Sequence, residues 1–487
     1  MELRKEEFKP LLSKCDMVQQ LFKCTQESAR LRRQHIFSHK RAINRTDNNT
    51  CVSIEELYKY YKSVEEALIS LEVTPHNSQT VLKLIKALFN TLINQVDQES
   101  LKKPIITSNI INFISLLIKR WNKYSNIMYM LLKTLLIFSV TAYTLEDPFC
   151  RLVPVLEHIM SLPNVNPNFI FKESIAWIIG NMSSDCPQFI KLISQSSVFI
   201  PQMIELIGYK YQSLRATCLW SLYCLAKSPL MTDKTIFASP LLLSQLNSIL
   251  KGNKEKERAV WILVSISSYI IHLPSKDILM IIETLLDQLI KTEDIDYSKA
   301  ILRCIGSFLA SDVTMVKCVE PIASNKKLYI AIDKLITIPS ILQECVWILS
   351  LLAADPKHCS TIGQSYTLLN FLQSQLNENT EYNVKKEILL TLYYLVSNNN
   401  AYVNSIGNEG VLSFCAQVLE KHMVKDVQMV MCILSIIDLV IDYLPDSKLF
   451  IKEIGGKVGI EKMIYFYEEN KEISLLAQAI VQKLTTN

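Results

Sequence analysis

The sequence predicts an all-α protein built from stacked helical repeats, and three observations lead to this class. The chain of 487 residues is too long for one ordinary core, since compact domains usually hold about 50–200 residues. It contains only 10 Gly, far below the usual share of about 7%, which favours helices joined by plain turns. From residue 80 onward, apolar residues recur at the three- and four-residue spacing of an amphipathic helix.

A repeated helical segment then indicates which kind of helical array the chain forms. Four of the five Trp residues lie in similar surroundings, and their spacings are 43, 41 and 86 residues, the last being twice 43. The skipped segment is Ala300-Ile-Leu-Arg303-Cys-Ile-Gly306-Ser307, which carries Arg in the Trp position; the same step reaches Leu135 before and Leu390 after. A period of roughly 40–47 residues is typical of armadillo and HEAT arrays. We therefore expect a right-handed superhelical α-solenoid, with the Trp residues at Trp177, Trp220, Trp261 and Trp347.

The N-terminal segment differs from the rest in charge. Residues 1–50 hold 11 Lys and Arg against 6 Asp and Glu, whereas residues 51–487 have a net charge of −1. The densest basic stretch is 29–45, and a polar linker follows at 46–50. We predict a basic arm over 1–50, a linker with a degenerate first repeat over 51–106 and the solenoid over 107–487. Nucleic acid, an acidic protein surface or a membrane surface could each accept such an arm.

Several function classes lack their sequence signals. The chain has no GxGxxG, Walker A or GxSxG motif, and its 13 scattered Cys include no CxxC pair, which indicates a reducing compartment. The charged start does not predict a signal peptide. His35 and His39 share a helical face but have no further ligands nearby. The apolar stretch Ile127–Leu145 has Lys133 in its middle, which favours a buried helix over a membrane span. We expect no enzyme, no cofactor and no metal site.

Three segments, taken in order, resemble a known family. Glu173-Ser-Ile-Ala-Trp-Ile-Ile-Gly-Asn-Met-Ser-Ser-Asp185 resembles the third armadillo repeat of importin α, the karyopherin adaptor of nuclear import. The Arg303 segment resembles the sixth repeat, where Arg also replaces Trp, and residues 450–462 resemble the tenth. The resemblance covers about 107–487. It implies about ten armadillo repeats, and an N-terminal basic helical arm that binds an importin β-type carrier.

The resemblance also implies where partners bind. Trp and Asn four residues apart project from one helix face, where indoles flank the stems of a basic nuclear localisation signal and carboxylates meet its ammonium groups. In the major cargo groove the matching residues are Glu173, Trp177, Asn181, Asp185, Trp220 and Trp261. In the minor groove they are Arg303, Glu344, Trp347 and Glu387. The carrier-binding arm would use Arg30, Arg32, Arg33, Lys40, Arg41 and Arg45.

Other expectations follow from the same family. A recycling exportin would bind the C-terminal repeat, near Glu468, Glu469 and Glu472, and the protein would shuttle between cytoplasm and nucleus. Direct contact with nucleic acid is not expected.

Two alternatives stay open. A Trp in each repeat is also what core packing requires, independently of ligands. In addition, the Asn position becomes Cys224, Ser265, Leu351 and Tyr394 in other repeats, and Lys254 and Arg258 stand where the family commonly has acids. The rival hypothesis is therefore a karyopherin-like scaffold with an eroded groove, which binds another protein or a membrane and carries no classical cargo.

Overall fold

The computed structural model describes residues 54–94, 104–140, 145–252, 254–270, 273, 275–310, 320–377, 379–420 and 426–486. In these residues every regular element is a helix, which confirms the all-α prediction. The chain divides into two compact units, with the boundary between residues 277 and 278. The basic arm over 1–50, including His35, His39 and all six carrier-binding candidates, lies outside the described residues.

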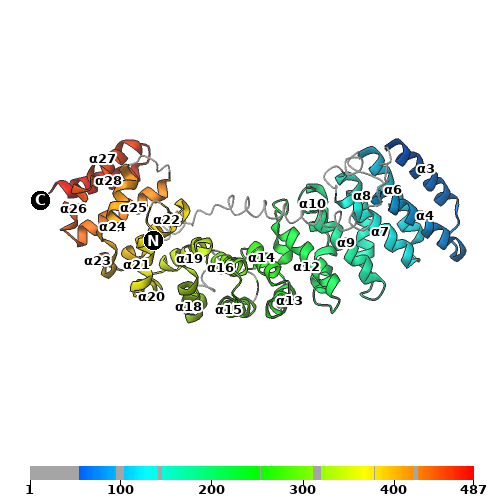
Figure 1. Cartoon of the computed structure of the whole chain (residues 1–487), viewed down its shortest axis with the longest axis horizontal. Coiled ribbons are helices and arrows are strands. Elements are labelled where there is room, and N and C mark those ends of the chain that lie inside the picture. Colours follow the sequence, from blue (N-terminus) through cyan, green and yellow to red (C-terminus); the bar gives the residue numbers. More distant parts are fainter. Residues whose placement is uncertain are drawn as a thin grey trace, which may run out of the picture. The chain divides into compact units, whose positions relative to one another are not determined.

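The first unit is a double layer of helices (Figure 1). One layer consists of helices that contact one another in chain order, namely α4 (Pro75–Asn94), α7 (Ser125–Ser139), α9 (Asn168–Met182), α12 (Gln212–Lys227) and α14 (Lys256–Ile266). The helices packed against this layer are α3 (Ile54–Ser70), α6 (Pro104–Trp121), α8 (Glu146–Met160), α11 (Phe199–Leu206) and α13 (Pro240–Lys251), and α10 (Pro187–Gln195) packs against α8 and α11. Helices α3 and α4 fall in the range predicted to hold a linker and a degenerate first repeat.

The second unit repeats this arrangement. Its corresponding layer contains α16 (Ile295–Ala310), α19 (Pro339–Ala353), α22 (Tyr382–Asn398), α25 (Val427–Tyr443) and α28 (Lys471–Thr485). The remaining helices are α15 (Ser275–Lys291), α18 (Lys326–Leu335), α20 (Cys359–Gly363), α21 (Tyr366–Ser374), α23 (Val403–Ile406), α24 (Glu409–Glu420), α26 (Ser447–Glu453) and α27 (Gly456–Phe466). We call α7, α9, α12, α14, α16, α19, α22, α25 and α28 the ladder helices.

Local sequence explains where many helices begin. Pro187, Pro240 and Pro339 occupy the first turn of α10, α13 and α19, where the missing N–H has no partner to lose and the fixed φ suits the helix. Asp426 caps α25 by accepting from the backbone N–H groups of Gln428 and Met429. Such caps satisfy donors that a helix start leaves unpaired.

The core consists of aliphatic side chains shared between neighbouring repeats. The ladder helices α9, α12 and α19 are buried on most of their circumference, because each is packed between two others and a second layer. Helix α7 contains most of the apolar stretch noted over Ile127–Leu145, and ten of its residues are buried; residues 141–144 lie outside the described residues. No helix in the described ranges is both long enough and apolar enough to cross a membrane.

Candidate peptide-binding face on the ladder helices

The third repeat places two of its predicted residues on one face of α9 and a third just beyond this helix. Glu173 and Trp177 are four residues apart on this helix, and Asp185 follows its C-terminal end. All three are half-buried, so part of each is open to solvent. We call these three residues the α9 face.

Glu173 is held in place by the next ladder helix. Its carboxylate accepts hydrogen bonds from the hydroxyl groups of Ser213 and Thr217 on α12. No Lys or Arg forms an ion pair with Glu173 among the described residues. The carboxylate is therefore oriented by neutral groups and keeps its negative charge available.

Asn181 does not belong to this open face, which corrects the sequence-based expectation. Its side chain is buried, and its amide nitrogen donates to the hydroxyl of Ser139 on α7 at 2.9 Å. The amide therefore ties two ladder helices together and is not available as a clamp for a peptide backbone.

Trp220 and Trp347 are core residues, which corrects a second expectation. Each indole is 2% exposed, and each covers a glycine of the preceding ladder helix. A Cβ built at Gly180 would lie 2.3 Å from the Trp220 ring, and one built at Gly306 would lie 2.2 Å from the Trp347 ring. Only glycine leaves room for an indole to pack this closely. Neither ring offers an open face for the stem of a lysine.

The burial of each Trp follows the size of a side chain on the preceding ladder helix. We call a glycine that lies under a buried indole a glycine seat, and the indole above it seated. We call residues 135, 177, 220, 261, 303 and 347 the ladder positions. Three residues after ladder positions 177 and 303 the chain has Gly180 and Gly306, and the following Trp is buried. Three residues after positions 135 and 220 it has Phe138 and Tyr223, and the following Trp is only half-buried. The two Trp residues that stay partly open are thus Trp177 and Trp261.

Trp261 already has a cation against its ring. The ammonium of Lys227, at the end of α12, lies 4.9 Å from the Trp261 ring centroid and 4.7 Å from that of Tyr223. Lys227 also donates to the Tyr223 hydroxyl at 2.8 Å and is 6% exposed. An ammonium over an aromatic face is attracted by the ring quadrupole. A lysine of the chain itself therefore fills the place that a ligand lysine was predicted to take.

The minor-groove acids are also occupied internally. Glu344, 3% exposed, accepts from Arg303 Nε at 2.8 Å, and Lys299 Nζ lies 3.6 Å from the same oxygen. Glu387, 5% exposed, accepts from the Ser350 hydroxyl at 2.7 Å. Burial raises the pKa of Glu387 to about 7. We predicted that these acids would receive basic cargo, but the structure buries both of them within the chain.

The sequence contained a signal for part of this result. The glycines at 180 and 306 are visible in the repeated segments, and a missing side chain next to an indole indicates a seat for it. Lys227 and Lys299 were missed. Their roles depend on the distance between neighbouring ladder helices, and a single repeat does not reveal that distance.

Comparisons with known proteins address the fold alone. No protein-family model and no curated protein sequence matches the chain. Among solved structures, an engineered protein is similar with a TM-score of 0.66 at 15% identity, covering 89% of this chain and 99% of that one. A designed armadillo repeat protein gives a TM-score of 0.39 at 17% identity, covering 50% of this chain and 99% of that one. Together, the likeness to the engineered protein and the recurring ladder helices identify an all-α, armadillo-like repeat scaffold.

Proposed function

We propose that this scaffold is a nuclear import adaptor without catalytic activity, which binds a short basic segment of its cargo on the α9 face. The observation that carries the proposal is the pair of half-open residues Glu173 and Trp177, four apart on α9, with the half-buried Asp185 in the turn that follows this helix. The basic arm over 1–50 would bind an importin β-type carrier, and the loaded protein would shuttle between cytoplasm and nucleus. A recycling exportin would bind the C-terminal repeat.

The chemistry of the α9 face suits a lysine or arginine side chain. The indole of Trp177 would cover the methylene stem, as amphipathic side chains favour. The carboxylates of Glu173 and Asp185 would attract the charged end, and because the site is partly shielded from water this attraction exceeds that of a fully exposed pair.

The internal contacts limit how many basic residues of a cargo peptide the protein can bind. Trp220 is seated on Gly180, and Trp261 is covered by Lys227. A bound peptide would therefore gain energy from one or two basic residues near α9, and not from a long ladder. We expect affinity below that of a groove in which every Trp is open.

A second candidate function is supported by the same contacts. The ammonium of Lys227 lies over the Trp261 ring, and Lys299 and Arg303 pair with Glu344. Cations of the chain thus take the places that the adaptor hypothesis gives to cations of the cargo. A karyopherin-like scaffold that binds another kind of protein would have no need of those positions. This candidate predicts that Lys-rich peptides do not bind.

The test is direct binding of a fluorescent Lys-rich nuclear localisation peptide to the full-length protein. We expect micromolar affinity, weakened at least about ten-fold by Trp177→Ala and by Asp185→Lys, because an aromatic contact and a charge pair are lost. Asp333→Lys is the matched control, since it makes the same charge change at an exposed position of α18. Binding should also weaken steeply as salt is raised.

Two outcomes would decide against the adaptor. If the peptide does not bind, or if all three variants bind it equally, the scaffold without classical cargo is the better description. The carrier interaction has its own test, in which the triple variant Arg30→Ala, Arg32→Ala, Arg33→Ala should abolish capture of an importin β-type carrier.

A further inference from the structure

A cavity of about 370 Å³ lies beside α12, and none of the residues of the α9 face lines it. It is enclosed by the end of α11, the first half of α12, the second half of α13 and the turn that precedes α14. Its lining is Ile207, Gly208, Gln212, Arg215, Leu219, Gln245, Ser248, Ile249, Gly252, Lys254 and Glu255. The cavity has the size of a small-ligand pocket.

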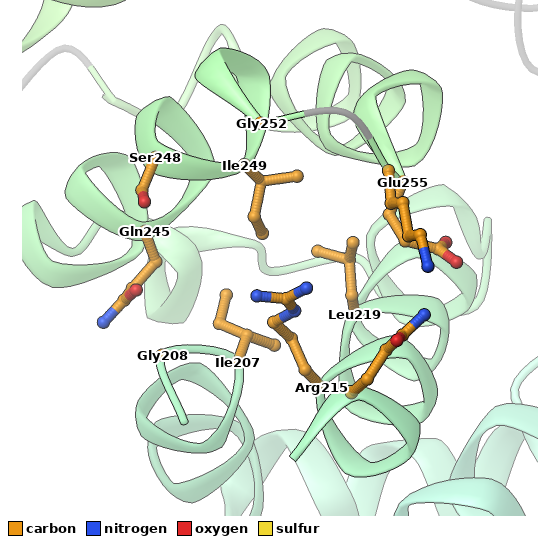
Figure 2. A pocket seen from close by; sticks show the side chains of 11 residues that line it. Ile207, Gly208, Arg215, Leu219, Gln245, Ser248, Ile249, Gly252 and Glu255 are labelled. Carbon is orange, nitrogen blue, oxygen red and sulfur yellow. The ribbon is translucent and has the colours of Figure 1, made fainter. Parts of the chain in front are cut away.

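The side chain of Arg215 points into the middle of this cavity (Figure 2). Its guanidinium forms no ion pair and no hydrogen bond with any described residue. On one side it faces the buried aliphatic side chains of Ile207, Leu219 and Ile249. Arg215 is half-buried, and no carboxylate among the described residues occupies its N–H groups, so these donors are available to a ligand.

The charge of the cavity is positive. Lys254 adds a second cation that also lacks an acidic partner within the described ranges. The single acid of the lining, Glu255, already forms an ion pair with Arg258 in the first turn of α14. The positive end of α12, which begins at Gln212, adds to the same potential.

Neutral donors surround Arg215. The side-chain amides of Gln212 and Gln245 and the hydroxyl of Ser248 line the cavity, and none of them hydrogen-bonds to another residue in the described part of the chain. These groups can donate to oxygen atoms while Arg215 binds two of them through parallel N–H groups.

We infer that this cavity binds an oxyanion, either a phosphate monoester or a carboxylate, with Arg215 as its principal ligand. The shared chemistry is a planar or tetrahedral group of oxygens with negative charge, which the fork of a guanidinium matches in geometry. The volume exceeds that of a bare ion, so there is room for the group that carries the oxyanion. The site does not depend on the proposed import function, because it uses none of the residues of the α9 face.

Calorimetric titration of the full-length protein tests this inference. The probes are phenyl phosphate and benzoate, which share one ring and differ in the oxyanion, with inorganic phosphate as a third probe and ionic strength held constant. Saturable binding of either aromatic probe supports the site, and the stronger of the two identifies the oxyanion. Arg215→Gln should weaken that binding at least about ten-fold, since a bidentate charged contact is lost.

Two further variants make the test specific. Ser248→Phe should block the cavity without a change in charge, so it remains informative if Arg215→Gln fails to fold. Lys251→Gln is the matched control, because Lys251 is an exposed cation of α13 that does not line the cavity. The inference is overturned if no probe saturates, or if Lys251→Gln weakens binding as much as Arg215→Gln does.

Discussion

The ammonium of Lys227 lies over the indole ring of Trp261, 4.9 Å from its centroid, and is hydrogen-bonded to Tyr223 at the same time. Two aromatic rings from neighbouring ladder helices thus enclose a cation that belongs to the chain. The half-open Trp177 shows no such internal cation among the described contacts. Under the proposed function, this difference would favour Trp177 over Trp261 as the contact for a basic peptide.

Replacement of Lys227 should open the Trp261 ring to a ligand. We expect Lys227→Ala, which removes the side chain that covers the ring, to bind a Lys-rich peptide about five-fold more tightly than the natural protein, because a cation–π contact of roughly 1 kcal/mol becomes available to the ligand. Fluorescence anisotropy measures the change. Lys191→Ala, at an exposed position of α10, removes the same charge and side chain elsewhere and should have little effect. Equal affinities for both variants and the natural protein would contradict the idea that Lys227 competes with a ligand.

The glycine seats should not tolerate a methyl group. Gly180→Ala and Gly306→Ala would each place a Cβ within 2.3 Å of an indole ring, so the ring must move. We expect each change to lower the free energy of unfolding by about 1–3 kcal/mol, the usual cost of overpacking. Urea denaturation followed by circular dichroism measures it. Gly410→Ala is the control, because its nearest neighbour would be 3.4 Å away. A pair of seat variants as stable as Gly410→Ala would disprove the tight fit.

Removal of Arg303 alone should destabilise the protein more than joint removal of Arg303 and Glu344. Arg303→Leu leaves a buried carboxylate with Lys299 at 3.6 Å as its remaining cation. We expect a loss of about 3 kcal/mol in the free energy of unfolding, at the low end for a broken buried pair because Lys299 remains near the carboxylate. Joint replacement of Arg303 and Glu344 by Leu should recover most of the loss. Lys299→Leu, which removes the more exposed cation, should cost less than about 1 kcal/mol. A double variant less stable than Arg303→Leu would contradict this account.

Glu387 should make the protein less stable as the pH rises toward neutrality. Burial raises its pKa from the ordinary 4.5 to about 7, so the folded state holds a proton that the unfolded state has released between these values. The free energy of unfolding therefore falls across this window, by on the order of 3 kcal/mol for this group. Glu387→Gln keeps an acceptor for Ser350 and should be the more stable form above pH 7. A stability difference between the two proteins that does not change with pH would contradict the raised pKa.

Much of the architecture could be predicted from sequence because it depends on periodicity. The spacing of Trp177, Trp220 and Trp261, and the Arg303 segment in the skipped place, predicted the ladder helices that the structure contains. The all-α class followed from scarce glycine and helical spacing of apolar residues. These are local properties of the chain, and no knowledge of packing distances is needed to read them.

The site was harder to predict, because burial depends on what the adjacent repeat presents. Trp220 and Trp261 have similar local sequences, yet one is seated on Gly180 and the other faces Tyr223 and Lys227. Similarly, Glu344 looks like a surface acid within its own helix, and only the position of Arg303 on α16 makes it a buried ion-pair partner. Side-chain volume and charge across repeats therefore decided which predicted residues remain open.

The Gly180–Trp220 and Gly306–Trp347 seats also restrict how the chain can be rearranged. A repeat with glycine at its seat must be followed by one with an indole, since a smaller side chain there would leave a void. A repeat with Phe138 or Tyr223 at that place cannot be followed by a seated Trp. Deletion or duplication of one repeat would join mismatched surfaces at α9–α12 or at α16–α19, even if every helix keeps its length. The matching side-chain volumes of neighbouring repeats therefore fix the order of the repeats, and at these two junctions the repeats are not interchangeable.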